Sequence, residues 1–367
     1  MIRPFRIGDI FLIQRLSRQS TKLNTTYALL EPTSGLRTAL TTVIPWNEAK
    51  IATYMLDQRG HKLARTGFLQ VQKRPGRSEA DVMLLAPALD TQLGHPAIWQ
   101  KLLVYYCNEA ARQQITRIYV DAPDQPLLVN TFSQVGFRVY TRQTIWRLSS
   151  YRAGTFSADP GNRVRPTTKA DEWALRRLYT RFSPPQVQQA EGFLTGNIVA
   201  KAVKLPILEW WQPTVRKSFV FEKKGDIQGW IDIAYGRNGI GLQLETDFDQ
   251  PDTTCIRQLL NYALTVITQE NKALPIYIGV REYHGGLGAA LADYGFAPFT
   301  DRAKLVKHVV QWVRNAATLL APALESIREV APTPFAFPEE PIHLNCDMRA
   351  GAQPPLWSPV TRVKEGE

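Results

Sequence analysis

The chain has 367 residues and a formal net charge of +11; 44% of its residues are hydrophobic and 21% are charged. This composition is typical of a soluble globular protein, and no stretch stays apolar for the about 18 residues that a membrane-spanning helix needs. We expect no membrane association and, because MIRPFRIGDI lacks an apolar leader core, no secretory signal. Cys107, Cys255 and Cys346 are too few and too far apart for a disulfide framework or a cysteine-based zinc site, which favours a cytoplasmic protein.

The first part of the chain predicts two helical regions, three strands, and then a helix, a strand, a helix and a strand. Residues 8–23 are amphipathic, with basic residues between the apolar positions Ile10, Ile13, Leu16 and Leu23. The predicted elements are helices through 8–23 and, less regularly, to about residue 49, strands at 51–56, 62–72 and 81–89, a helix at 96–114, a strand at 117–121, a helix at 127–135 and a strand at 140–148.

The second part predicts the same succession. Its elements are helices at 171–182 and 186–203, strands at 219–222, 228–235 and 241–246, a helix at 254–270, a strand at 275–280, a helix at 287–294 and a strand at 304–309. We therefore predict one domain at 1–150, a linker rich in Gly, Ser and Asp at 151–162, a second domain at 163–315, and a helical then Pro-rich tail at 316–367.

An internal repeat supports this division. Ile98–Val120 aligns without a gap to Ile256–Ile278, and each copy leads to a Gly-Phe dipeptide, at 136–137 and 295–296. Each half also opens alike, with Ile2-Arg3-Pro4 and Val164-Arg165-Pro166. A repeat this long is a duplicated domain rather than a solenoid unit.

The order of elements, the opening tripeptides and the Gly-Phe dipeptides resemble the GNAT family, the GCN5-related N-acetyltransferases. The resemblance covers nearly everything before the tail. It implies an α/β protein of two tandem GNAT-like domains, each a mixed central sheet with helices on both faces. It also implies acetyl transfer from acetyl-CoA to an amine, and in tandem members of the family one half can carry the chemistry while the other is a scaffold.

The resemblance implies an acyl-CoA site at the fourth strand and at the N-terminus of the helix that follows. In the first half these positions are Leu84, Leu85 and Ala86 on the strand, and Gly94, His95 and Ala97 in the loop. The loop has one Gly, no Arg, a Pro96 that lacks an N–H, and Trp99 where the family has a last glycine. The corresponding second-half loop carries Asp247, Asp249 and Asp252, whose charges compete with a pyrophosphate.

The family's general acid, a Tyr four residues before the Gly of Gly-Phe, is replaced by Phe132 and Leu291. The second half offers Glu245 as a general base, because apolar neighbours can raise the pKa of a carboxyl; the alternative is an exposed Glu at a strand end. His95 is a second candidate base, and the alternative is a solvated residue that caps a helix. His284, in the loop Glu282–Gly286, has the same two interpretations.

Two classes of function remain open. The first is an acetyl-CoA-dependent N-acetyltransferase whose acceptor is a small-molecule or peptide amine. The second is a catalytically inactive tandem module that binds a ligand or protein partner. The net positive charge also permits nucleic-acid binding, but the basic residues are not clustered with aromatic residues, so this is the least favoured. The sequence does not identify the acceptor or the oligomeric state.

Overall fold

The computed structural model describes residues 1–30, 51–57, 66–74, 76–151, 163–192, 215–247, 253–270 and 274–309. We call 1–151 the first half and 163–309 the second half, and both belong to one compact unit, Met1–Trp312. The predicted linker (except residue 151) and the predicted tail lie outside the described residues. Among the described residues, no helix is long and apolar enough to cross a membrane.

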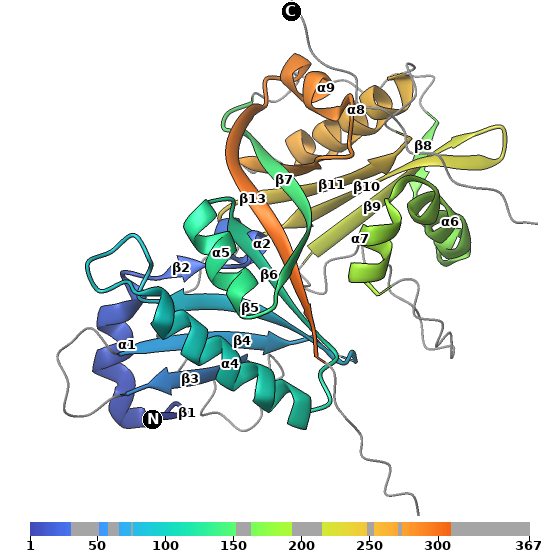
Figure 1. The fold of residues 1–367 in the computed structure, drawn as a ribbon. Coiled ribbons are helices and arrows are strands. Elements are labelled where there is room, and N and C mark those ends of the chain that lie inside the picture. Colours follow the sequence, from blue (N-terminus) through green and yellow to red (C-terminus); the bar gives the residue numbers. More distant parts are fainter. Residues whose placement is uncertain are drawn as a thin grey trace, which may run out of the picture. The chain divides into compact units, whose positions relative to one another are not determined.

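The first half contains most of the predicted elements (Figure 1). They are β1 (Ile2–Pro4), a 3-10 turn at Ile7–Asp9, α1 (Ile10–Ser17), β2 (Thr21–Lys22), α2 (Thr25–Leu29), β3 (Ile51–Leu56), β4 (Gly67–Lys73), β5 (Glu79–Ala86), α4 (Pro96–Arg112), β6 (Arg117–Pro123), α5 (Pro126–Gln134) and β7 (Arg138–Leu148). The prediction of one helix through 8–23 was wrong at its end. The helix ends at Ser17, because the chain then turns to pair with β5 as the short strand β2.

The second half repeats the succession. Its elements are β8 (Val164–Pro166), a 3-10 turn at Lys169–Asp171, α6 (Glu172–Phe182), α7 (Pro185–Ala190), β9 (Val215–Lys223), β10 (Asp226–Tyr235), β11 (Ile240–Thr246), α8 (Thr254–Gln269), β12 (Ile276–Arg281), α9 (Leu287–Asp293) and β13 (Ala297–His308). The opening of each half is fixed in the same way, since Arg3 forms a two-bond ion pair with Asp9 and Arg165 forms one with Asp171.

One sheet runs through both halves, because the halves exchange their last strands. Its order is β1-β3-β4-β5-β6-β13-β7-β12-β11-β10-β9-β8. β13 pairs antiparallel with both β6 and β7, and β7 pairs antiparallel with β12 (Figure 1). Each half is therefore completed by a strand from the other. The sequence does not indicate this exchange, and the domain boundaries stay a prediction from the repeat.

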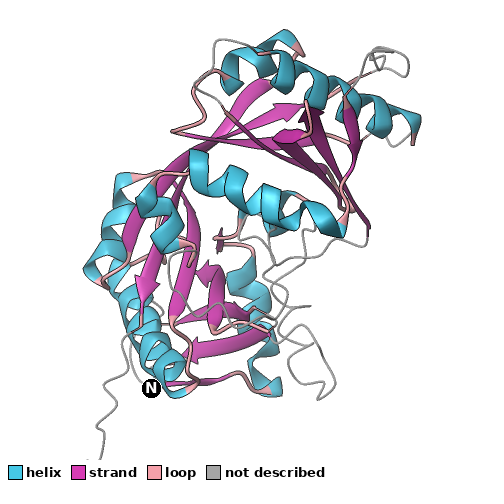
Figure 2. Cartoon of the chain, turned by 90° about the vertical axis from the view of Figure 1, so that its right-hand side faces the viewer, coloured by secondary structure: helices cyan, strands magenta, loops and turns pink. Residues whose placement is uncertain are grey.

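Helices cover both faces of the sheet in each half (Figure 2). In the first half, alternate residues of β3, β4 and β5 pack against α4 on one face and against α1 on the other, as the period of two in a strand requires. In the second half α8 and α6 take the same two positions. This mixed sheet with helices on both faces is the predicted fold class.

Candidate functional site

Each half has a gap where two parallel strands diverge. β5 and β6 pair only from Glu79 with Arg117 to Asp81 with Tyr119. β11 and β12 pair only as far as Leu242 with Ile278. In α/β sheets, ligands bind beyond the carboxyl ends of such strands. Both gaps are therefore candidate binding sites.

The first gap is filled by the chain itself. Thr21 and Lys22 of β2 pair with Leu85 and Leu84 of β5. The next residue, Leu23, donates its N–H to the Met83 carbonyl at 2.9 Å and accepts a hydrogen bond from the Asp121 N–H at 3.0 Å. Because β4 pairs along the other edge of β5, the backbone of Leu84 and Leu85 has no edge left for a pantetheine arm. The structure argues against the acyl-CoA position expected there.

The loop after β5 has a packing role. A methyl group at Gly94 would lie 2.1 Å from the Ala88 carbonyl oxygen, so glycine is needed for this close approach. His95 is exposed and its Nδ1 accepts a hydrogen bond from the Ala97 N–H at 3.1 Å, so His95 caps α4. Trp99, which replaces the family glycine, is fully buried and donates to the Pro87 carbonyl. The capping interpretation of His95 therefore fits better than a base.

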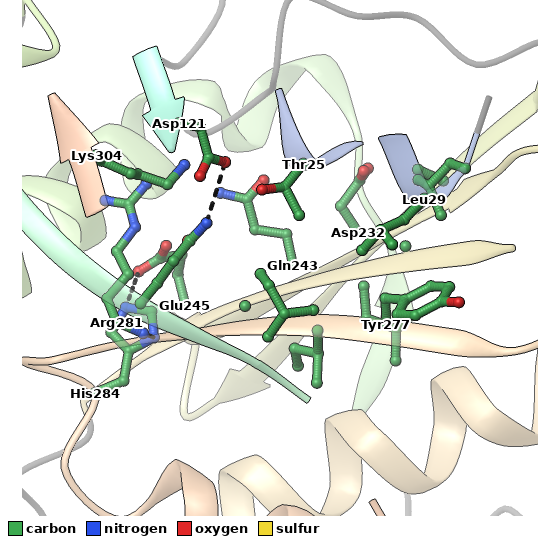
Figure 3. Close-up of a pocket in the computed structure, with 18 of the residues that line it drawn as sticks. Thr25, Leu29, Asp121, Asp232, Gln243, Glu245, Tyr277, Arg281, His284 and Lys304 are labelled. Carbon is green, nitrogen blue, oxygen red and sulfur yellow. Dashed lines mark hydrogen bonds and ion pairs between the residues drawn. The ribbon is translucent and has the colours of Figure 1, made fainter. Parts of the chain in front are cut away.

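The second gap opens into a cavity of about 100 Å³ that residues of both halves line (Figure 3). Its floor is the face of β10, β11, β12 and β7 opposite α8. The first half contributes Asp121 of β6, Gln143 and Ile145 of β7, and Thr25, Leu29 and Leu30 at α2. The exchanged strand β13 contributes Lys304.

Glu245 points into this cavity from β11 and only 4% of it is exposed. Burial raises the pKa of its carboxyl to about 7, and the nearby charge of Arg281 opposes that rise. The alternative of an exposed Glu was therefore wrong. Of the three candidate bases from the sequence, Glu245 and His284 line this cavity and His95 does not.

His284 is Glu245's neighbour. Its Nε2 lies 3.7 Å from Glu245 Oε2, and its Nδ1 accepts a hydrogen bond from the Arg281 N–H at 3.4 Å. Burial holds the pKa of His284 well below its usual range, so the imidazole is neutral and its proton lies on Nε2, facing Glu245. The solvated interpretation of His284 was wrong, because the ring is buried.

A buried ion pair stands beside these two residues. Arg281 lies 3.0 Å from Glu191, which accepts a 2.5 Å hydrogen bond from the Tyr179 hydroxyl. Arg281 also donates to the Tyr283 hydroxyl at 2.5 Å. Sequence reasoning missed Arg281 and Glu191. The only signal was an arginine at the end of an otherwise apolar strand, IYIGVR.

The end of α2 closes one side of the cavity. Leu30 is buried, and its carbonyl accepts a hydrogen bond from the Asn238 N–H at 3.1 Å. A methyl group at Gly236 would lie 2.5 Å from the Leu30 carbonyl oxygen, and one at Gly241 would lie 2.8 Å from Leu30 Cδ1. Glycines of the β10–β11 hairpin thus make the notch that seats this first-half residue.

Gly288 of α9 also serves packing. A methyl group at Gly288 would lie 3.2 Å from the Trp146 ring, so its small size admits β7 against α9. Asp249 and Asp252 of the corresponding second-half loop lie outside the described residues.

The fold and its two gaps define a tandem GNAT acyltransferase fold. A tandem GNAT protein from the clavulanic acid biosynthesis pathway is 12% identical to this chain, with 85% of this chain and 99% of that one covered and a TM-score of 0.50. A GCN5-related N-acetyltransferase from Sphaerobacter thermophilus is 13% identical, with 85% and 96% covered and a TM-score of 0.50. No protein-family model and no curated protein matches the chain. At these identities the likeness shows the fold alone.

Proposed function

We propose that the chain is an acetyl-CoA-dependent N-acetyltransferase whose reaction takes place at the second gap. The observation that carries the proposal is Glu245, a buried carboxyl with a pKa of about 7 that faces a cavity between diverging strands. A general base is most effective when its pKa is near the working pH. The acetyltransferase neighbours in fold support this choice of reaction.

The residues of the second gap fit the donor substrate better than those of the first. Beyond Leu242, the β12-facing edge of β11 pairs with no strand among the described residues, so its backbone is available to the pantetheine arm. The cavity itself, at about 100 Å³, is below the roughly 300–1,000 Å³ of sites that enclose drug-sized ligands. We therefore place only the acceptor, or its reacting end, inside the cavity.

In this reaction Glu245 takes a proton from the acceptor amine while the nitrogen attacks the thioester carbonyl carbon. A C–N bond forms and the C–S bond breaks, and CoA leaves as a thiolate that takes up a proton from water. A thiol has a pKa of about 8.5, so the CoA thiolate is a good leaving group. It can therefore leave without a positioned general acid, although Leu291 replaces the family tyrosine. His284 Nε2 lies 3.7 Å from the Glu245 carboxylate, which is beyond hydrogen-bond distance, so His284 neighbours the base without a direct hydrogen bond to it.

The test compares binding and turnover in the full chain and in Glu245→Gln. We expect calorimetry to show micromolar acetyl-CoA binding that the substitution leaves unchanged. Release of CoA thiol with a panel of amines should fall in kcat/KM by about 10²- to 10⁴-fold, the usual contribution of a general base. Glu172→Gln, whose side chain is 45% exposed on α6, is the matched control. No heat up to millimolar acetyl-CoA would contradict the proposal.

The inactive module is the second candidate, because the first gap is closed and Leu291 takes the place of the acid. It predicts that small ligands bind in the cavity and that no amine in the panel releases thiol from acetyl-CoA.

A further inference from the structure

The cavity at the second gap has two chemically different ends (Figure 3). Asp121, Lys304, Glu245, Arg281 and His284 gather at one end. The other end contains apolar side chains together with the Asp232–Arg216 pair; its apolar lining comes from Leu29, Leu30, Ala234 and Tyr277. An acceptor that fits has a charged head and a short apolar side chain.

Most charges that line the cavity are already paired inside the protein. Arg216 is bonded to Asp232, Arg281 to Glu191, and Asp121 to Arg302. Within the described ranges, Lys304 makes no ion pair. The basic side chain within 4 Å of the Glu245 carboxylate is His284, whose imidazole is neutral. Lys304 and Glu245 thus lack a charged partner within ion-pair distance in the described part of the chain, although the charge of Lys304 acts on Asp121 and on Glu245.

The strand exchange puts Lys304 there. In β13 it stands opposite Asp121 of β6 and Thr141 of β7, so its side chain shares their face of the sheet. Lys304 is half-buried, and a cation withdrawn from water is costly unless an anion neutralises it. Asp121 is already shared by Arg302 and Gln143. A ligand carboxylate beside Lys304 would give this cation a direct ion-pair partner in addition to the nearby charge of Asp121.

We propose that the acceptor is a small α-amino acid with an apolar side chain: its amine lies at Glu245, its carboxylate at Lys304, and its side chain toward Leu29, Leu30 and Tyr277. This inference rests on the proposed function, whose site it specifies. A cavity of about 100 Å³ suits a small molecule of this kind and excludes a folded peptide.

The experiment titrates the full chain by calorimetry, without acyl-CoA, with alanine, valine and leucine and with two analogues of leucine. 3-Methylbutylamine lacks the carboxylate, and 4-methylpentanoate lacks the amine. We expect at least one of the three amino acids to bind, and leucine to bind at least tenfold more tightly than either analogue, because a charge-assisted contact is lost in each. Lys304→Met should weaken leucine at least tenfold and leave 3-methylbutylamine unchanged. Lys101→Met, an exposed residue of α4, should change neither.

Several results would overturn the amino-acid assignment: no binding of any of the three amino acids at 10 mM, equal binding of leucine and its amine, or no effect of Lys304→Met. Acetyl transfer that prefers amines without a carboxylate would overturn it too, and would leave the proposed function standing. Leucine binding that depends on Lys304, together with no thiol release from acetyl-CoA, would support the ligand class and reject the transferase. The two failures are therefore distinguishable.

Discussion

The two gaps of this protein share a backbone geometry and differ in what occupies it. In the first half, the side chains of Leu84, Leu85 and Ala86 are apolar and the backbone of Leu23 bridges the diverging strands. In the second half, Gln243 and Glu245 take part in a polar cavity and the edge of β11 is open among the described residues. A duplicated fold can thus keep its strand geometry in both copies while only one copy keeps groups suited to chemistry.

The difference extends to the ends of the neighbouring strands. β6 ends at Pro123, whereas β12 ends at Arg281. Only the latter brings a buried cation, paired with Glu191, next to a candidate base. The first half instead supplies walls to the second, through α2, β6 and β7. The closed half is therefore part of the site that the open half offers.

The largest effect on stability is expected from Arg281→Met. The substitution leaves Glu191 buried without its cation, and breaking a buried ion pair from one side costs about 3–5 kcal/mol. Urea unfolding measures the change in the free energy of unfolding. Arg257→Met is the matched control, because its pair with Asp293 is about 60% exposed on both sides and is worth about 0–1 kcal/mol. Equal losses of unfolding free energy in the two variants would show that the buried Arg281–Glu191 pair stabilises the protein no more than an exposed ion pair does.

Leu30→Ala tests whether the first half closes the second gap. A buried Leu→Ala change costs about 2–5 kcal/mol, and here it also opens the notch formed by Gly236 and Gly241. We expect a lower melting temperature and weaker leucine binding. Leu16→Ala, equally buried but on α1 away from the cavity, should lower the melting temperature alone. Loss of leucine binding in both variants would contradict a local role for Leu30.

A smaller effect is expected from pH. The Glu245 carboxyl has a pKa of about 7 and acts as a base only when ionised. Below that pH, kcat/KM should therefore fall about tenfold for each unit, and above it the rate should level off. A pH profile of thiol release measures this. Glu245→Gln should flatten the profile, and a wild-type plateau that extends down to pH 5 would argue against Glu245 as the base.

The smallest effect is expected from His95→Ala in the first half. His95 caps α4, and loss of such a cap costs about 1 kcal/mol. The rate of thiol release should not change. A large loss of rate with little loss of stability would reopen the first half as a reaction site.

The sequence alone determined the repeat, the element order and the GNAT-like fold. Periodicity and turn residues are local, so strands such as Ile51–Leu56 and the helix that begins at Pro96 were predicted correctly. It also identified Glu245, because a carboxyl residue within an otherwise apolar strand can be recognised from the local sequence alone. It did not separate His95 from His284, since both are histidines beside glycine in loops.

Only the tertiary structure decided which gap is open and which residues line it. The closure of the first gap uses backbone groups of Leu23 and Asp121, and a backbone hydrogen bond leaves no trace in residue identity. The exchange of β7 and β13, which carries Lys304 into the cavity, depends on pairing between strands far apart in the chain. Residues of both halves line the cavity at which Glu245 is buried, and burial raises the pKa of its carboxyl.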